Sequence, residues 1–305
     1  MIFRVEPLNR PHAHGTSGEL AARVVGLDLR QSMEDATFER LLQAHAQFPV
    51  LIFEDQFLDD DQQIAFTKKF GVPEETYGVF SDRIKRTRLK RTDFADISNL
   101  DDKDEIVQDG DERRYFALSN RVWHVDKTFH EIPSRVGILT AKEVPSRGGG
   151  TEFADMRAAW DALSDEEKHR LRGLSVVHDT LWSRGRLGVK FSEEEAKRLT
   201  PVTQPILRTS ARTGRTNLYL SSHSHHIVGW PKQEGRDFIE RLTAHATQPR
   251  FCYVHHWKVG DVLLWDQRCT MHRAADDFDE FKERRVLART AVKELERPSE
   301  SVAFA

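Results

Sequence analysis

Apolar residues recur at two different spacings in the first part of the chain, and these spacings predict alternating strands and helices. Residues 24–29 alternate loosely, as in a short strand, and residues 32–47 carry apolar side chains at helical intervals. Residues 50–53 read VLIF, a short continuous run that is typical of a buried strand. Acidic residues then offer N-terminal caps for a helix over residues 59–70, which glycine and proline terminate.

The second half of the chain alternates short strand-like runs with helical stretches. We predict helices over residues 155–172, with a break and a restart inside this range, and over residues 192–198 and 232–244. Strands with helices inserted between them predict a mainly β protein, namely a double-stranded β-helix or cupin-like jelly roll. No repeat or linker divides the sequence, so we expect a single domain over residues 1–305 with a helical insertion at about 155–200. The short strands are predicted at residues 136–143, 151–153, 204–208, 217–220, 251–255, 261–265 and 285–292.

Between residues 77 and 119 the hydrophobic pattern dissolves. Residues 83–91 are strongly basic, whereas residues 101–112 are strongly acidic. One interpretation is that the two runs are solvated faces or loops whose charges offset each other. The other is an irregular, mobile lid over a functional site, because long irregular segments are often functional. The basic run is short and lacks interleaved aromatic residues, so it does not predict nucleic-acid binding.

The composition narrows the class of protein. Hydrophobic residues make up 38% of the 305 positions and charged residues 31%, which is typical of a globular protein with a hydrated surface. A net charge of −3 gives no attraction to nucleic acid or to an anionic membrane. The two cysteines do not suggest a disulfide framework, and no segment predicts a signal peptide or a membrane helix. We therefore expect a cytoplasmic protein.

Two separated fragments offer the ligands of a metal site. His124 and Asp126 lie in WHVD at residues 123–126, and His272 follows a predicted strand in what we expect to be a polar loop. Two imidazoles and one carboxylate hold ferrous iron on one face and leave other positions open. With 14 histidines in the chain, about one His-x-Asp triplet is expected by chance, so the triplet alone is a weak signal. The later histidine and the arginines that follow it strengthen the prediction.

Five fragments carry the pattern of a known family most strongly, namely DQQIAF at 61–66, WHVD at 123–126, GGGTEFADMRAAW at 148–160, VGDVLLWD at 259–266 and MHR at 271–273. Through these fragments the chain, from about residue 50 to residue 295, resembles the iron(II)/2-oxoglutarate dioxygenases of the taurine/2,4-dichlorophenoxyacetate type. The stretches 95–99 and 151–163 look more like the aryloxyalkanoate branch of that family than the taurine branch. The resemblance implies iron(II) bound by the two histidines and the aspartate, with 2-oxoglutarate as co-substrate and dioxygen as oxidant.

A 2-oxoglutarate site needs a cation for the far carboxylate of the co-substrate, and the planar fork of arginine matches a carboxylate. Arg285 and Arg289 would share one face of a strand, whereas Arg284 would face the other way. The resemblance assigns the co-substrate carboxylate to Arg285, assisted by the hydroxyl of Thr151. The loop before this strand is a residue or two longer than the family pattern. Arg284 therefore stays an alternative, and strand parity favours Arg285.

The resemblance also suggests residues that contact the prime substrate. Arg289 is expected near its anionic end, and Asn120 and His223 match positions that line the pocket. His223 lies in SSHSHH at 221–226, which is alternatively an exposed turn; a second metal site there is not expected, because no carboxylate or cysteine accompanies the histidines. The expected substrate is a small anionic aryloxyalkanoate such as 2,4-dichlorophenoxyacetate. Hydroxylation next to the ether oxygen would release a phenol and an oxoacid, together with succinate and CO2.

Three other functions stay open at this point. The first is the same chemistry on a sulfonate such as taurine or on an alkyl sulfate ester. The second is a non-enzymatic jelly-roll binding protein, which would leave the paired arginines and the complete triad unexplained. The third is a metal-dependent hydrolase, which would need a general base that we do not find beside the metal. We expect a homo-oligomer with no nucleic-acid or membrane partner.

Overall fold

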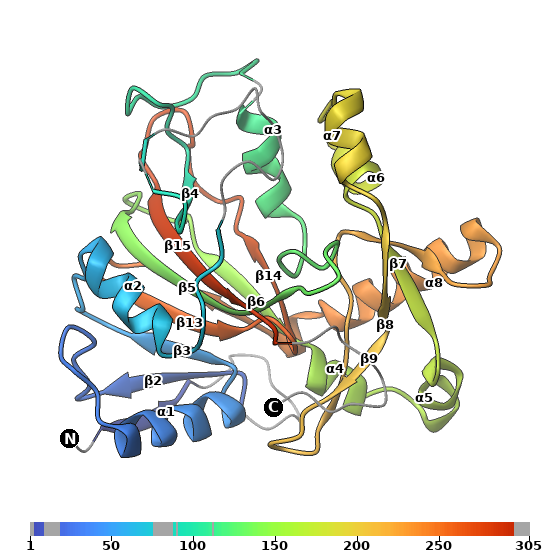
Figure 1. Ribbon diagram of the computed structural model, residues 1–305, viewed down its shortest axis with the longest axis horizontal. Helices are drawn as coiled ribbons and strands as arrows, with labels where there is room; N and C mark the ends of the chain where they lie inside the picture. The colour runs from blue at the N-terminus through green and yellow to red at the C-terminus, as the bar shows by residue number, and fades with distance from the viewer. Residues whose placement is uncertain (1–2, 9–18, 76–87, 90, 112, 296–305) are drawn as a thin grey trace.

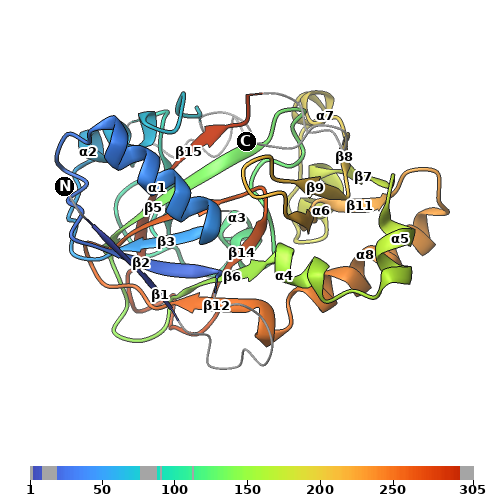
Figure 2. The same cartoon turned by 90° about the horizontal axis from the view of Figure 1, so that it is seen from below.

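The computed structural model describes residues 3–8, 19–75, 88–89, 91–111 and 113–295. Its centre is a pair of β-sheets that confirms the predicted jelly roll (Figures 1 and 2). The larger sheet has seven strands, in the order β1 (Arg4–Pro7), β2 (Ala21–Val25), β3 (Val50–Phe53), β13 (Val262–Asp266), β5 (Ser134–Glu143), β15 (Val286–Lys293) and β4 (Ala95–Ser98).

The smaller sheet consists of three antiparallel strands, β12 (Cys252–His255), β6 (Thr151–Asp155) and β14 (Thr270–Ala274). Alternate side chains of the larger sheet, such as Leu139, Leu263 and Leu287, form one hydrophobic cluster with Phe153 of the smaller sheet. Trp265 joins this cluster and is 1% exposed. The two sheets therefore share a core, and the period of two in each strand decides which side chains enter it.

Helices α1 (Asp35–Gln47) and α2 (Asp60–Lys68) cover the other face of the larger sheet. The alternate strand residues Ile138 and Leu264 pack there against Leu41 and Phe66. Asp59 caps α2 through a capping box with Gln62, as the acidic run predicted. In Figure 1 these helices lie at the opposite end of the molecule from α8.

The chain between β6 and β12 packs around a second hydrophobic cluster, which Val125, Ala154 and Met271 also join. It contains a three-stranded sheet in the order β11-β7-β8 and the strand pair β9-β10. The predicted helical insertion at about 155–200 is interrupted by strand β7, which the sequence pattern did not predict. The elements are α4 (Met156–Asp161), α5 (Asp165–Leu171), β7 (Ser175–His178), α6 (Thr180–Gly185), α7 (Glu193–Arg198), β8 (Val202–Pro205), β9 (Leu207–Thr209), β10 (Thr216–Leu218), β11 (Ser224–Ile227), α8 (Lys232–Ala246) and the 3-10 turn η2 (Pro249–Phe251).

The segment expected to be irregular, residues 77–119, contains regular structure where it is described. Strand β4 pairs with β15, and helix α3 (Arg113–Leu118) leads into the 3-10 turn η1 (Ser119–Arg121). Arg88, from the basic run, forms ion pairs with Asp96 at 2.8 Å and with Asp104 of the acidic run at 3.2 Å. At these residues the charges of the basic and the acidic run thus offset each other. Residues 76–87, 90 and 112 lie outside the described part of the chain. The role of a lid stays a prediction.

Within the described residues, no helix combines the length and the apolar character that a membrane crossing requires.

Candidate functional site

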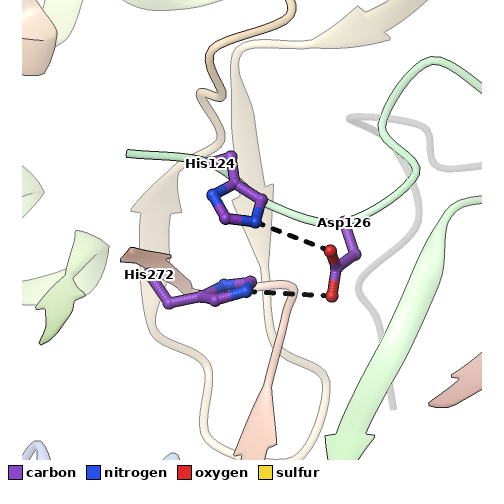
Figure 3. A group of neighbouring side chains, drawn as sticks. All are labelled: His124, Asp126 and His272. Atoms are coloured by element: carbon purple, nitrogen blue, oxygen red, sulfur yellow. Dashed lines mark ion pairs between the residues drawn. The ribbon is translucent and has the colours of Figure 1, made fainter. Parts of the chain in front are cut away.

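His124, Asp126 and His272 converge at one edge of the smaller sheet (Figure 3). The main chains of the two histidines bond to each other: the amide of His124 donates to the carbonyl of His272 at 3.0 Å, and the reverse bond measures 2.9 Å. His272 lies inside strand β14 opposite Phe153, so the expected polar loop at this position is wrong. Strand β14 reads TMHRA, and its polar residues made it look like a loop in the sequence.

The spacing of the three side chains fits a metal ion. Nε2 of His124 lies 3.7 Å from Oδ1 of Asp126, and Nε2 of His272 lies 3.8 Å from Oδ2. The ligand atoms of the triad all lie within 4.8 Å of one another. Nδ1 of His124 is 2.8 Å from the carbonyl oxygen of Val122, an arrangement that orients the ring and leaves Nε2 as the ligand atom.

Burial sets the charge states that a metal site requires. It lowers the pKa of His124 to about 4, although the Asp126 carboxylate opposes the shift, and it lowers the pKa of His272 well below its ordinary value. Burial alone would raise the pKa of Asp126, but Arg289 and the two histidines bring it below its ordinary range. At neutral pH the site therefore presents two neutral imidazoles and one carboxylate, the forms that bind divalent metals.

Two further residues hold Asp126 in place. The amide of Asp126 donates to Oε1 of Gln267 at 3.1 Å, and the side-chain amide of Gln267 donates to Oδ2 of Asp126. Nη1 of Arg289 donates to Oδ1 at 2.6 Å. The sequence analysis did not single out Gln267. Its position directly after the VGDVLLWD fragment, which resembles the family, could have drawn attention to it.

Arg285 lies in a separate buried corner of the site. Its Nε donates to the carbonyl of Gly149 at 2.6 Å, and its Nη2 lies 3.3 Å from the hydroxyl of Thr151. Trp257, which the sequence reasoning did not single out, donates its indole N–H to the same hydroxyl at 3.0 Å. Burial lowers the pKa of Arg285 to about 10, so its guanidinium stays charged at neutral pH. Among the described residues it forms no ion pair.

Arg284 points the other way, as strand parity predicted. Its guanidinium forms ion pairs with Glu143 at 2.7 Å and with Asp104 at 2.8 Å, and its side chain is 34% exposed. Arg285 is 6% exposed. Only Arg285 therefore occupies the interior.

The residues expected to contact the substrate come from three segments: β15, η1 and the turn before β11. Arg289 contacts Asp126, so it has a protein carboxylate as a partner. His223 is 1% exposed, and its Nδ1 lies 2.7 Å from the hydroxyl of Ser183; the alternative of an exposed turn is therefore wrong for this residue. Asn120 is half-buried in η1. The triad is the one cluster of metal-ligand type in the described chain, so the histidine-rich run forms no second cluster there.

Comparison with known proteins agrees with the geometry. The family model described as Taurine catabolism dioxygenase TauD, TfdA family matches residues 6–291. An alpha-ketoglutarate-dependent 2,4-dichlorophenoxyacetate dioxygenase from Burkholderia sp. (strain RASC) is 40% identical, over 82% of this chain and 84% of the relative. An (S)-phenoxypropionate/alpha-ketoglutarate-dioxygenase from Delftia acidovorans is 33% identical, over 85% of this chain and 87% of the relative.

A solved structure extends the likeness to three dimensions. It is described as the crystal structure of AAD-2 in complex with Mn(II) and N-oxalylglycine, with a TM-score of 0.90 and 36% identity. The match covers 98% of this chain and 100% of the other. Taurine and sulfate ester dioxygenases are more distant relatives. The chain belongs to the taurine catabolism dioxygenase TauD, TfdA family.

Proposed function

We propose that this chain is an iron(II)- and 2-oxoglutarate-dependent dioxygenase that hydroxylates an aryloxyalkanoate such as 2,4-dichlorophenoxyacetate. The observation that carries this proposal is the combination of the triad with Arg285, a buried arginine that forms no ion pair among the described residues. The resemblance to herbicide dioxygenases over most of both chains supports the substrate class. Such an activity belongs to the catabolism of aromatic compounds. A non-enzymatic binding protein and a hydrolase do not fit this family.

His124, Asp126 and His272 are proposed to hold iron(II). Their three ligand atoms lie within 4.8 Å of one another, and a set of two histidines and one carboxylate leaves other coordination positions open for further ligands. Bound iron would supply the activation of dioxygen, with 2-oxoglutarate as the source of the two further electrons and succinate and CO2 as its products. The protein contributes by keeping both imidazoles neutral and the carboxylate ionised.

Arg285 is proposed to bind the distal carboxylate of 2-oxoglutarate, together with the hydroxyl of Thr151. A buried guanidinium whose contacts are neutral oxygens is costly, and a carboxylate that forms two parallel hydrogen bonds offsets that cost. Trp257 fixes the hydroxyl, and the carbonyl of Gly149 orients the guanidinium. These residues bind and orient the co-substrate before the reaction begins.

Arg289, Asn120 and His223 are proposed to surround the prime substrate. Hydroxylation of the carbon between the ether oxygen and the carboxylate would give a hemiacetal, which collapses to a phenol and an oxoacid. One oxygen atom of O2 enters this product, and the other enters succinate. The role of the protein is to place that carbon beside the metal and to hold the carboxylate away from it.

The test is consumption of 2-oxoglutarate with a panel of phenoxyacetates, taurine and an alkyl sulfate, with and without added ferrous iron. We expect iron-dependent formation of succinate together with a phenol, in equal amounts, from the phenoxyacetates. Release of sulfite or sulfate with no phenol would move the function to the sulfur substrates. Absence of succinate with every substrate and added iron would contradict the proposal as a whole.

The homo-oligomer and the cytoplasmic location expected from the sequence stay predictions. Light scattering during gel filtration measures the subunit number, and fractionation of cells that express the protein measures its location.

A further inference from the structure

Five arginines of the described chain are buried, and they divide into two groups. In the first group the guanidinium forms a close ion pair with a buried carboxylate. In the second group, Arg184 and Arg285, the described residues provide no ion pair. The pairs of the first group are Arg157–Asp155 at 3.0 Å, Arg208–Glu294 at 2.5 Å and Arg268–Asp266 at 2.7 Å.

Burying an unpaired charge is costly, so each member of the second group calls for an explanation. The proposed function explains Arg285 through the co-substrate. It leaves Arg184, which is 8% exposed, without a role. The sequence reasoning also passed over Arg184, because it lies in a stretch with no recognised motif.

Arg184 lies in helix α6, next to the segments proposed to bind the substrate. Its Nη1 donates to the carbonyl oxygen of Ser119 at 3.4 Å, a long hydrogen bond to a neutral acceptor. Ser119 precedes Asn120 in η1. The neighbouring Ser183 lies 2.7 Å from Nδ1 of His223. A guanidinium has five N–H donors, so after this one contact most of its hydrogen-bond donors can still bind another group, such as an anion.

The charge of the same guanidinium also acts on residues of the metal site. Burial lowers the pKa of Arg184 to about 10, and the Asp126 carboxylate opposes that shift. Burial lowers the pKa of His223 and of His124, and the charge of Arg184 contributes to both shifts. Arg184 therefore stays charged at neutral pH, within electrostatic reach of the triad and of His223.

We propose that Arg184 binds the anionic group of the prime substrate and selects anionic over neutral substrates. The inference rests on the proposed function and adds a residue to it. Arg289 already donates to the Asp126 carboxylate at 2.6 Å, so the protein itself compensates its charge. The charge of Arg184 lacks such a partner. The two unpaired buried arginines then serve two different anions: Arg285 binds the co-substrate, and Arg184 binds the substrate.

A purely structural role for Arg184 would be to tie α6 to η1 through Ser119. The two roles differ in their readout. A structural tie affects every ligand of the pocket alike, whereas an anion-binding residue distinguishes a carboxylate from a neutral group of similar size. A lysine in place of Arg184 keeps the charge and would preserve part of the discrimination only if the charge is what matters.

The experiment is titration calorimetry on the full chain loaded with Mn(II) and N-oxalylglycine, a redox-silent metal and an analogue of the co-substrate. The ligands are 2,4-dichlorophenoxyacetate, its neutral primary amide, taurine and an alkyl sulfate. The variants are Arg184→Gln and Arg184→Lys. Arg186→Gln is the matched control, because Arg186 is the C-terminal cap of the same helix and its side chain is 58% exposed.

We expect Arg184→Gln to weaken binding of the acid by about ten- to a hundred-fold, the loss for a charged hydrogen bond, and to leave binding of the amide unchanged. Arg184→Lys should retain part of the preference, and Arg186→Gln all of it. The affinity for N-oxalylglycine should stay constant, which also shows that each variant folds. Equal losses for acid and amide, or no loss for either, would overturn the role of Arg184.

Failure of the proposed function has a different signature. If the wild-type protein binds no phenoxyacetate but binds taurine or the alkyl sulfate, the substrate class is wrong. The role of Arg184 is then decided by whether Arg184→Gln weakens binding of that anion. If the wild-type protein binds the amide as tightly as the acid and binds neither sulfur compound, Arg184 selects no anion and the inference is overturned.

Discussion

The two halves of the site are built in different ways. In the half that would hold the metal and the co-substrate, ladder register fixes the strand residues: His272 of β14 faces Phe153 of β6, and Ala274 faces Thr151. His124 joins this sheet through main-chain bonds to His272, and Arg285 directly precedes β15. The half that would hold the substrate stands on η1 and α6 and on the turn before β11. The amide of Asp179, the N-cap of α6, donates to the carbonyl of His223 at 2.8 Å, and side-chain contacts such as Ser183 to His223 connect the segments further. We therefore expect the shared chemistry to depend on the sheets, and selection of the substrate to depend mainly on the inserted segments.

This difference leads to a general expectation for mutagenesis. Changes in the sheet half should act on the metal or on 2-oxoglutarate and be independent of the substrate offered. Changes in the inserted half should act on the substrate and leave the co-substrate unaffected. The following predictions test that division, beginning with the change that should have the largest effect.

Replacing Asp126 by Ala should abolish iron binding and turnover while the fold is retained. Asp126 lies at a turn, and it is the one anionic ligand of the triad. The measurement is iron stoichiometry, with circular dichroism to check the fold. Asp155 is a matched control, because it is also buried and pairs with an arginine, Arg157, at 3.0 Å. Asp155→Ala should cost about 3–5 kcal/mol of stability, as expected for a broken buried ion pair, and keep the metal. An Asp126→Ala protein that still binds one iron would refute the triad.

Arg285→Gln should raise the Michaelis constant for 2-oxoglutarate far more than that for the prime substrate. Loss of a charge-assisted, two-point contact in a buried corner is worth about 2–4 kcal/mol, or roughly thirty- to a thousand-fold. Arg284→Gln is the control, because Arg284 is the adjacent residue but pairs with Glu143 and Asp104 at the surface. Steady-state kinetics at saturating substrate decide between them. A larger effect from Arg284→Gln would mean that Arg284, and not Arg285, binds the carboxylate of the co-substrate.

Gln267→Leu should weaken metal binding about ten- to a hundred-fold, as is typical when a residue that orients a metal ligand is lost. Gln267 exchanges two hydrogen bonds with Asp126, one through each of its amide atoms. Competition with a chelator measures the affinity. Gln204→Leu is the control, since Gln204 is equally buried but donates to the main chain at Thr128 and His130. If both variants keep the wild-type affinity, Asp126 does not depend on Gln267 for its orientation.

The sequence pattern predicted the sheet half well because its signals are local. Residues 50–53 form β3 with the predicted bounds, and the helix predicted at 232–244 is α8, Lys232–Ala246. The period of two placed Arg285 inside and Arg284 outside. Strand β4 was missed because its support comes from β15, which lies far along the chain. No local pattern reports a pairing of that kind.

The inserted half was less accessible from the sequence. His223 was proposed through the resemblance to a family. Arg184 was not singled out, because Ser119 and Asp126, with which it interacts, come from a different segment. Trp257 was missed for the same reason: its contact with Thr151 joins residues that only the fold brings together. Local sequence patterns predict helices and strands and which of their side chains are buried. They do not predict which distant residues those side chains contact.

The smallest expected effects come from two hydroxyl deletions, one in each half. Thr151→Val removes the hydroxyl that Trp257 and Arg285 contact at 3.0 and 3.3 Å. Ser183→Ala removes the hydroxyl 2.7 Å from His223. Each change deletes a hydrogen-bonding group worth about 1 kcal/mol, or about five-fold in an equilibrium constant. Thr151→Val should raise the Michaelis constant for 2-oxoglutarate alone, and Ser183→Ala that for the substrate alone.

The pair is informative because the two deletions are chemically alike and differ in position. Both remove one hydroxyl from a buried residue, so a general loosening of the protein would affect them equally. Opposite selectivity, with each variant impaired toward one ligand, would show that the two halves act separately. If Ser183→Ala also raised the Michaelis constant for 2-oxoglutarate, helix α6 and the sheet corner around Arg285 would be coupled. Substrate selection would then depend on the sheets as well as on the inserted segments.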